Sequence, residues 1–409
     1  MMSAALFDLA LRVSARDVGA AVPRLLHNPA PKREVTVAVS ARRAGGAIRV
    51  QAIGPNGRAE TGSGAAGLAA IARAAGCANG DLGGGPSAVV EGGASLRALA
   101  ILATRFADPS RCDSVAVAAG SALAGWWVER AAHPGTTAVA DVLAVSRQRY
   151  VLGVPPGADH PNLWRRAFGA AGGLAGAHTW HRAVTAGPVL PGLEPTREDD
   201  DWLLGTYQDA LSDGRSWDVP ESLYLAAVRL RSRCDAADVF EAALLCDPLW
   251  RARGIHTGHV CTGDVVVGVS SAGTGRVVVH ANRLDTRLRA GTGVIGWAGA
   301  PMADMPAVDA RFSGEVVTTS VEDGALAVAI GGLRRSGYRP AAGETVTVIP
   351  APPSPSTIRS GRRVLARLYR RRFSWLSQGV TPTPVRRDVP LAVVIAAAEN
   401  EEYDNEGDM

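Results

Sequence analysis

Two similar stretches decide the fold of the C-terminal half of the chain. They are Val260-Cys261-Thr262-Gly263-Asp264-Val265-Val266 and Arg311-Phe312-Ser313-Gly314-Glu315-Val316-Val317, and their central glycines are 51 positions apart. Each stretch is followed by a glycine-containing turn and an alternating apolar run, at 276–280 in the first copy and at 325–329 in the second. Short strands separated by glycine turns are typical of small β-barrels.

The repeat predicts a duplicated, β-barrel-like region. We expect it to span residues 254–350, with one small barrel in the copy at 259–297 and a second in the copy at 310–349. Within each copy, Gly-Asp-Val or Gly-Glu-Val is interpreted as a turn leading into a strand.

The rest of the chain predicts a multidomain α+β protein. Residues 1–114 form an N-terminal small α+β unit, with a helix over 4–26, a hairpin of strands 35–39 and 47–53, and Ala/Leu-rich helices at 65–75 and 94–106. Residues 115–253 form a central, mainly helical domain with helices at 161–171, 197–212, 219–232 and 235–252. A proline linker and a basic segment occupy 351–398, and an acidic tail follows at 399–409.

Charge is distributed unevenly along the 409 residues. The net charge is +4, but the tail after Ala398 holds six acidic and no basic residues, which leaves +10 on residues 1–398. A basic body with an acidic tail is typical of proteins that bind polyanions, although such a tail also occurs as a merely solvated terminus. The basic residues are almost all arginine, a bias that a GC-rich coding sequence also produces.

Cysteines and apolar runs indicate the compartment. The five cysteines are odd in number and contain no CxxC pair, which argues against a disulfide scaffold or zinc ribbon and favours a cytoplasmic protein. The first 22 residues carry two aspartates and two arginines among the apolar positions, so we expect no signal peptide. No run of 18 apolar residues occurs, so no membrane span is expected.

The stretch Val139-Ala140-Asp141-Val142-Leu143-Ala144-Val145-Ser146-Arg147-Gln148-Arg149-Tyr150 points most directly to a partner. Over about residues 134–153 it resembles the helix-turn-helix superfamily of bacterial DNA-binding proteins. The resemblance implies a first helix with the small Ala140 at the helix crossing, and a second helix that begins at Ser146 as its N-cap. It also implies that Arg147, Gln148 and Arg149 face the major groove, where Arg can bind guanine and Gln adenine.

Two features of this segment depart from the superfamily. Ala144 stands at the turn where glycine is usual, and Gly153 with Pro155 ends the second helix after about two turns. The alternative interpretation is a single helix followed by a buried strand at 150–154.

The segment 359–375 is the second candidate for nucleic-acid contact. It combines aromatic residues with seven arginines, which are Arg359, Arg362, Arg363, Arg367, Arg370, Arg371 and Arg372. These charges could neutralise phosphates, and Tyr369 or Trp375 could stack on bases. Val364, Leu365, Leu368 and Trp375 also give the segment an apolar face, so docking on a neighbouring domain or on an acidic partner is the alternative.

Other motifs give no cofactor, metal or catalytic site. Gly62-Ser63-Gly64-Ala65-Ala66-Gly67 matches G-x-G-x-x-G, but the preceding strand is predicted to end near Ile53 and no acidic residue has the required spacing. His178/His181 and His256/His259 lack the further ligands of a zinc site. The acidic run 198–201 is interpreted as favourable charge at the start of a helix.

Three hypotheses about function follow from the sequence. The first is a non-enzymatic DNA-binding protein, a regulator, replication or DNA-organising factor, that contacts duplex DNA through residues 146–149 and the basic segment. The second is a scaffold or assembly protein whose β-rich region binds other proteins. The third is an enzyme with an unrecognised site in the N-terminal unit, although the sequence contains no recognisable catalytic motif. The oligomeric state is not predicted.

Overall fold

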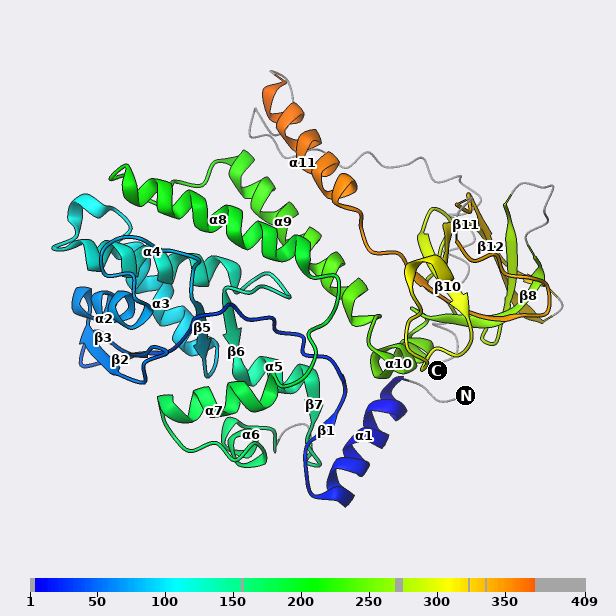
Figure 1. Cartoon of the computed structure of the whole chain (residues 1–409), viewed down its shortest axis with the longest axis horizontal. Coiled ribbons are helices and arrows are strands. Elements are labelled where there is room, and N and C mark those ends of the chain that lie inside the picture. Colours follow the sequence, from blue (N-terminus) through cyan, green and yellow to red (C-terminus); the bar gives the residue numbers. More distant parts are fainter. Residues whose placement is uncertain (1–3, 156–157, 269–274, 323, 335–336, 372–409) are drawn as a thin grey trace, which may run out of the picture.

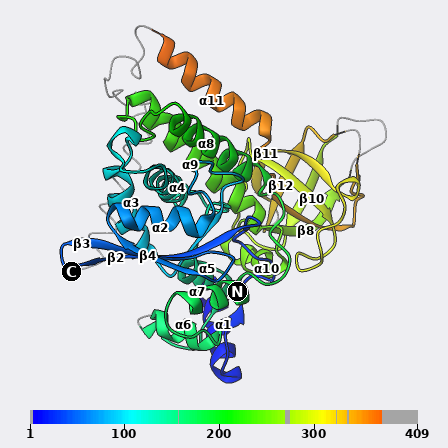
Figure 2. The same cartoon turned by 60° about the vertical axis from the view of Figure 1, so that its left-hand side comes forward.

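The computed structural model describes residues 4–155, 158–268, 275–322, 324–334 and 337–371, and it has the expected mixed α+β character (Figure 1). A layered α/β body occupies one side of the molecule and a β-barrel the other. Helices lie between the body and the barrel, and Figure 2 shows the same arrangement from a second direction.

A five-stranded mixed sheet organises the body. Its strands lie in the order β4-β3-β2-β5-β6. Their bounds are β2 Thr36–Ala44, β3 Ala47–Ile53, β4 Ala59–Ser63, β5 Ser87–Val90 and β6 Val139–Asp141. The hairpin expected at Gly45-Gly46 joins β2 to β3, and both glycines have positive φ, as a tight hairpin turn requires. β5 and β6 run parallel to β2.

Helices cover both faces of this sheet. One face carries α2 Ala65–Ala75, α3 Gly93–Arg105 and α4 Val115–Arg130. The other carries α5 Val142–Arg149, α6 Pro161–Ala167 and α7 Leu174–Val184. Successive side chains of β2 serve the two cores in turn, since Val37 and Val39 pack with the first group and Ala38 with the second. Sheet and core both continue across residue 114, where we expected one unit to end.

Three further helices lead from this body to the barrel. They are α8 Glu194–Ser212, α9 Leu223–Leu244 and α10 Pro248–Thr257. The break between the last two differs from the predicted break near residue 233. It falls at Asp247-Pro248, where the Asp247 carboxylate accepts hydrogen bonds from the amides of Leu249 and Trp250 and starts α10.

The β-rich region forms one closed six-stranded barrel rather than two small barrels. Its strand order is β10-β11-β12-β9-β8-β13. The bounds are β8 Cys261–Val267, β9 Val277–Ala281, β10 Gly293–Ala298, β11 Phe312–Glu322, β12 Ala325–Gly331 and β13 Thr345–Pro350. Three strands come from each predicted copy, and strands of one copy pair with strands of the other. Three strands alone cannot close a barrel, so the two copies share one core.

The pairing pattern is the same in both copies. Val265 pairs with Val279 in the first copy, and Val316 pairs with Ile330 at positions 51 residues later. The β-bulges also correspond, between Val265 and Val267 and between Val316 and Thr318. A shared register and a shared bulge are structural features of a duplication.

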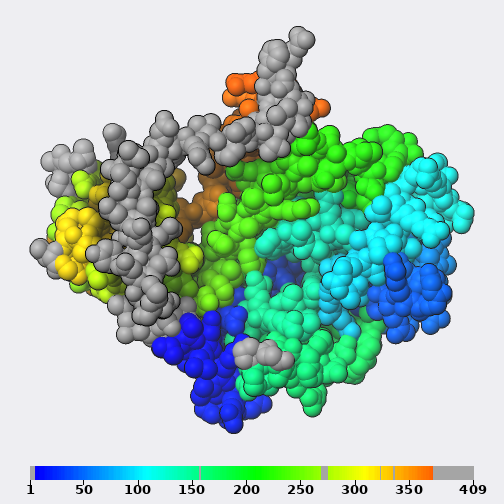
Figure 3. All heavy atoms as spheres, turned by 180° about the vertical axis from the view of Figure 1, so that it is seen from behind, coloured from blue at the N-terminus to red at the C-terminus, as the bar shows by residue number. Residues whose placement is uncertain are grey.

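A buried arginine forms hydrogen bonds to both the helical body and the barrel. Arg251 of α10 is fully buried and donates to the carbonyl oxygens of Leu245, Cys246, Pro301 and Ala303. The last two carbonyls belong to the loop after β10, so this one side chain joins the two parts. From behind, Figure 3 shows barrel and body side by side, with the N-terminal helix α1 Ala4–Val18 below their junction. No helix in the described ranges has the length and apolarity needed to cross a membrane.

Candidate nucleic-acid interface

The segment that resembles a helix-turn-helix folds differently from that expectation. Residues 139–141 form strand β6 instead of a first helix, and α5 then runs without interruption from Val142 to Arg149. The Asp141 carboxylate caps α5 by accepting from the Ala144 amide at 3.0 Å, which places Ala144 in the first turn of the helix. A short strand, β7 Tyr150–Val151, follows. The arrangement is that of the alternative interpretation, a helix leading into a strand.

The side chains expected to face DNA are occupied within the fold. Ser146 is fully buried, donates to the Val142 carbonyl at 2.7 Å and accepts from the Trp180 indole at 2.9 Å. It therefore lies inside the helix rather than at an N-cap, and we correct that prediction.

Of the three residues after Ser146, the two arginines make contacts within the fold. Arg149 is 5% exposed, and its guanidinium donates to the carbonyls of Val184, Ala186 and Leu26. Arg147 lies at the surface in an ion pair with Asp159, and Gln148 is half-buried. Ser146 and Arg149 are therefore not available to base edges, because their side chains are buried and bonded within the fold.

The basic segment forms helix α11, Pro355–Arg370, which begins at the N-cap Ser354. The helix lies along α9 at the outer edge of the molecule (Figure 1). Gly361 of α11 approaches Arg231, and Tyr369 stacks on Tyr224 with ring centroids 4.6 Å apart, so the two helices run antiparallel. The Ser354 hydroxyl accepts from the Thr357 amide at 3.1 Å, which explains why the helix starts directly after the proline-rich linker.

The inner face of α11 is docked on the body by apolar and ionic contacts. Ile358 is buried in a cluster with Val239 and Phe240. Arg362 donates to both carboxylate oxygens of Asp199 on α8, at 2.9 and 2.5 Å, and this hydrogen bonding raises the pKa of the Arg362 guanidinium. The expected alternative, docking on a neighbouring part of the chain, is thus observed for one face of the segment.

The outer face of α11 carries the remaining described arginines. Four of them, which we call the arginine face, are exposed and make no ion pair or hydrogen bond through their side chains in the described part of the chain: Arg359, Arg363, Arg367 and Arg370. Their spacing of four, four and three residues places them within about 80° of the helix circumference and over about 16 Å of its length. Arg371 is exposed and has a partner, and Arg372 lies outside the described residues, as does the acidic tail.

The acidic run 198–201 supplies partners that sequence reasoning missed. α8 begins at Glu194, so these acids lie within the helix rather than at its start. Asp199 binds Arg362, the fully buried Asp200 binds Arg130, and Asp201 binds Arg33. Three neighbouring acids thus pair with three different arginines. The sequence shows the acidic run but does not indicate which arginines pair with it.

The glycine motif and His181 lie in closely packed parts of the fold. β4, a strand that we did not predict, leads directly into the glycine motif. The glycines of the motif permit close packing, because a Cβ on Gly62 would lie 2.3 Å from the Ala66 oxygen and one on Gly67 would lie 2.9 Å from Val50. Burial lowers the pKa of His181 to about 4, which suits a neutral core histidine. Among the described residues, no group of three or more His, Cys, Asp or Glu could hold a metal ion.

Comparison with known proteins adds no assignment. No family model, no curated protein and no solved structure matches the chain.

Proposed function

We propose that this protein binds nucleic acid through the phosphate backbone, with the arginine face of α11 as its contact surface. The observation that carries the proposal is that four exposed arginines without partners in the described residues share one face of a helix whose opposite face is docked. Arginine suits this role because its planar guanidinium binds phosphate oxygens in a bidentate manner and remains charged at every physiological pH.

The geometry of the arginine face allows several phosphates to be contacted at once. Successive arginines are about 4.5 to 6 Å apart along the helix axis, and all four lie on one side of the helix. The docked inner face supports the same use, because Ile358, Arg362 and Tyr369 hold the helix in place before any ligand arrives. A preformed helix has less conformational entropy to lose on binding than an unfolded basic segment.

Binding through phosphates predicts little sequence preference. Phosphate contacts position a protein on the duplex without reading bases, and of the residues once expected to read bases Ser146 and Arg149 are buried and Arg147 is paired with Asp159. Affinity should therefore fall steeply with salt, with a slope of about 0.9 in log K per log salt for each neutralised phosphate of duplex DNA.

The test compares two variants that lose the same charge. In the first, Arg359, Arg363, Arg367 and Arg370 are all changed to Gln. In the second, four exposed arginines from other surfaces are changed to Gln: Arg16, Arg166, Arg182 and Arg289. Binding to a mixed-sequence duplex is measured by fluorescence anisotropy from about 50 to 200 mM salt.

We expect the first variant to bind at least about tenfold more weakly at low salt and to lose up to about 3.6 from the salt slope. The second should keep most of the slope. An unchanged slope in the first variant, or an equal loss in both, would reject the arginine face as the contact surface. If the protein binds an acidic protein and does not bind DNA, the arginine face is a protein-binding surface instead.

A further inference from the structure

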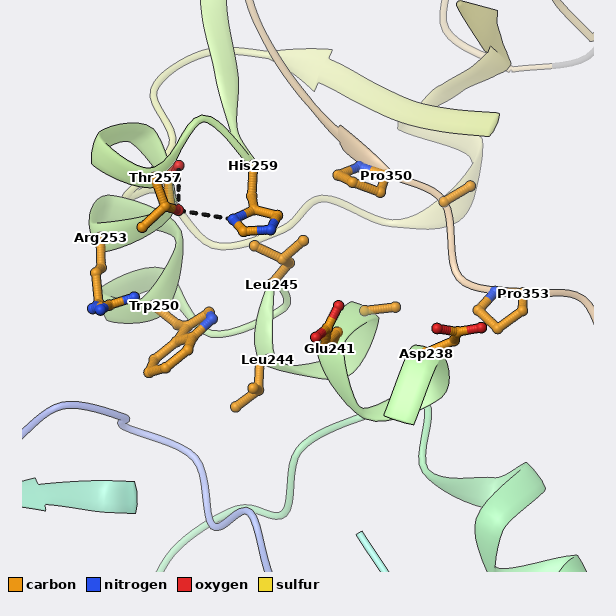
Figure 4. A pocket seen from close by; sticks show the side chains of 13 residues that line it. Asp238, Glu241, Leu244, Leu245, Trp250, Arg253, Thr257, His259, Pro350 and Pro353 are labelled. Atoms are coloured by element: carbon orange, nitrogen blue, oxygen red, sulfur yellow. Dashed lines mark hydrogen bonds between the residues drawn. The ribbon is translucent and has the colours of Figure 1, made fainter. Parts of the chain in front are cut away.

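A cavity of about 390 Å³ lies where α9, α10 and the chain leaving the barrel meet (Figure 4). Its apolar walls come from three parts of the chain: Leu244 and Leu245 at the end of α9, Trp250 of α10, and Pro350 and Pro353, at and just beyond the end of β13. A cavity of this size between packed elements is in the range that holds small organic molecules.

Two carboxylates that make no ion pair with a described residue line the same cavity. Asp238 and Glu241 lie one turn apart on α9, opposite Pro350 and Pro353 in Figure 4. Both residues are exposed, and neither side chain makes an ion pair or hydrogen bond within the described part of the chain.

The positive groups nearby do not neutralise these carboxylates. Arg253 forms a bidentate ion pair with Asp8, with both distances 3.0 Å, and its guanidinium lies 5.2 Å from the Trp250 ring centre. Burial lowers the pKa of His259, so its ring is neutral near pH 7. Arg287, which does not line the cavity, donates to the His259 ring at 3.3 Å. The α9 side of the cavity therefore carries two carboxylates that make no ion pair with any described residue.

From the cavity, its apolar walls and the two unpaired carboxylates, we infer a binding site for a small organic cation, an amine or amidine attached to an apolar or aromatic body. The cationic group binds between Asp238 and Glu241 through charge-assisted hydrogen bonds. The apolar body lies against Trp250, Leu244 and Pro350, where aromatic and aliphatic surfaces leave water together. This inference is independent of the proposed nucleic-acid binding, because an anion and a cation cannot use the same site.

The test uses phenethylamine as the probe, with full-length protein in isothermal titration calorimetry. Two compounds of the same shape isolate the charge: 2-phenylethanol is neutral and 3-phenylpropionate is an anion. We expect phenethylamine to bind at least about tenfold more tightly than the alcohol, and the propionate not to bind. Equal binding of amine and alcohol, preference for the propionate, or no binding of the amine would overturn the proposal.

Variants locate the site. Asp238→Asn combined with Glu241→Gln should weaken amine binding at least about tenfold, and because both side chains are exposed the fold should persist, which circular dichroism checks. Glu315→Gln, an exposed carboxylate on the barrel, is the matched control and should bind as the unmodified protein does. Ala242→Phe fills the cavity and should abolish binding. Unchanged affinity in both the carboxylate and the filling variants would place the amine elsewhere and reject the site.

Discussion

Gly263 and Gly314 lie at equivalent positions in the two halves of the barrel, each pressed against a backbone carbonyl of the paired strand. A Cβ on Gly263 would lie 2.0 Å from the His280 oxygen, and one on Gly314 would lie 2.6 Å from the Gly331 oxygen. The two carbonyls are themselves 51 residues apart, like the glycines. Both glycines lie inside strands rather than at the turns that we expected. The glycine common to the two copies therefore allows two backbones to approach closely.

Alanine at either glycine should destabilise the barrel. Gly263→Ala and Gly314→Ala each force two backbones apart, which we expect to lower the free energy of unfolding by about 1–3 kcal/mol. Urea denaturation followed by circular dichroism measures the change. Gly205→Ala is the control, because Gly205 lies in α8 with open space around it, so alanine should be neutral or stabilising. Equal stability of all three variants would contradict the close contact.

Arg149 and Arg147 should differ sharply in their effect on stability. Arg149→Ala leaves three buried or half-buried carbonyls without a donor and should lower the free energy of unfolding by about 3 kcal/mol or more. Arg147→Ala removes only a surface ion pair and should cost at most about 1 kcal/mol. Thermal and urea unfolding provide the comparison. If Arg149→Ala left stability intact but altered the preferred DNA sequence, the original helix-turn-helix expectation would be restored.

The free energy of unfolding should decrease as the pH is lowered, because His181 is buried in its neutral form. Burial lowers its pKa from 6.5 to about 4, so the unfolded state takes up a proton more readily than the folded state. The contribution is fully present above pH 6.5 and is lost as the pH falls from there towards 4. Between pH 7 and pH 5 it amounts to about 2 kcal/mol.

His181→Gln removes this titration, so its free energy of unfolding should decrease less over the same interval. His133, whose pKa is also lowered to about 4 by burial, is present in both proteins and cancels in the difference. Identical pH dependence of protein and variant would show that His181 does not titrate in this range.

The contact between Arg362 and Asp199 should hold α11 in place. A double-mutant cycle of Arg362→Gln and Asp199→Asn is expected to give a coupling energy of about 1–2 kcal/mol, because the pair is bidentate and partly buried. Amide hydrogen exchange of α11 provides a local readout and should speed up in each single variant. Arg363→Gln, on the exposed side of the helix, should show no coupling to Asp199.

The acidic tail should compete with phosphates for the arginine face. Deleting residues 399–409 removes six acidic groups from the same chain and should tighten DNA binding at low salt. The gain should shrink as salt rises, because screening weakens the competition. The same deletion in the variant without the four arginines of the arginine face is the control and should give no gain. An unchanged affinity at low salt would leave the tail without a role in binding.

The sequence by itself determined the features that arise from local pattern and repetition. The hairpin at Gly45-Gly46 and the helices at 65–75 and 94–106 follow from turn chemistry and from apolar periodicity. The 51-residue repeat predicted the duplication, and the apolar positions of the basic segment predicted that one of its faces could dock.

Only the tertiary structure decided how these pieces combine. Strand pairing between residues far apart merged two copies into one barrel, since three strands cannot close on themselves. The parallel pairing of Val139–Asp141 with β5 turned an expected helix into a strand, because backbone hydrogen bonds to a neighbouring strand outweigh local propensity. The tertiary structure also determines which arginines are buried and which are exposed. Arg149 and Arg362 bind groups distant in sequence, whereas Arg363 and Arg367 are exposed.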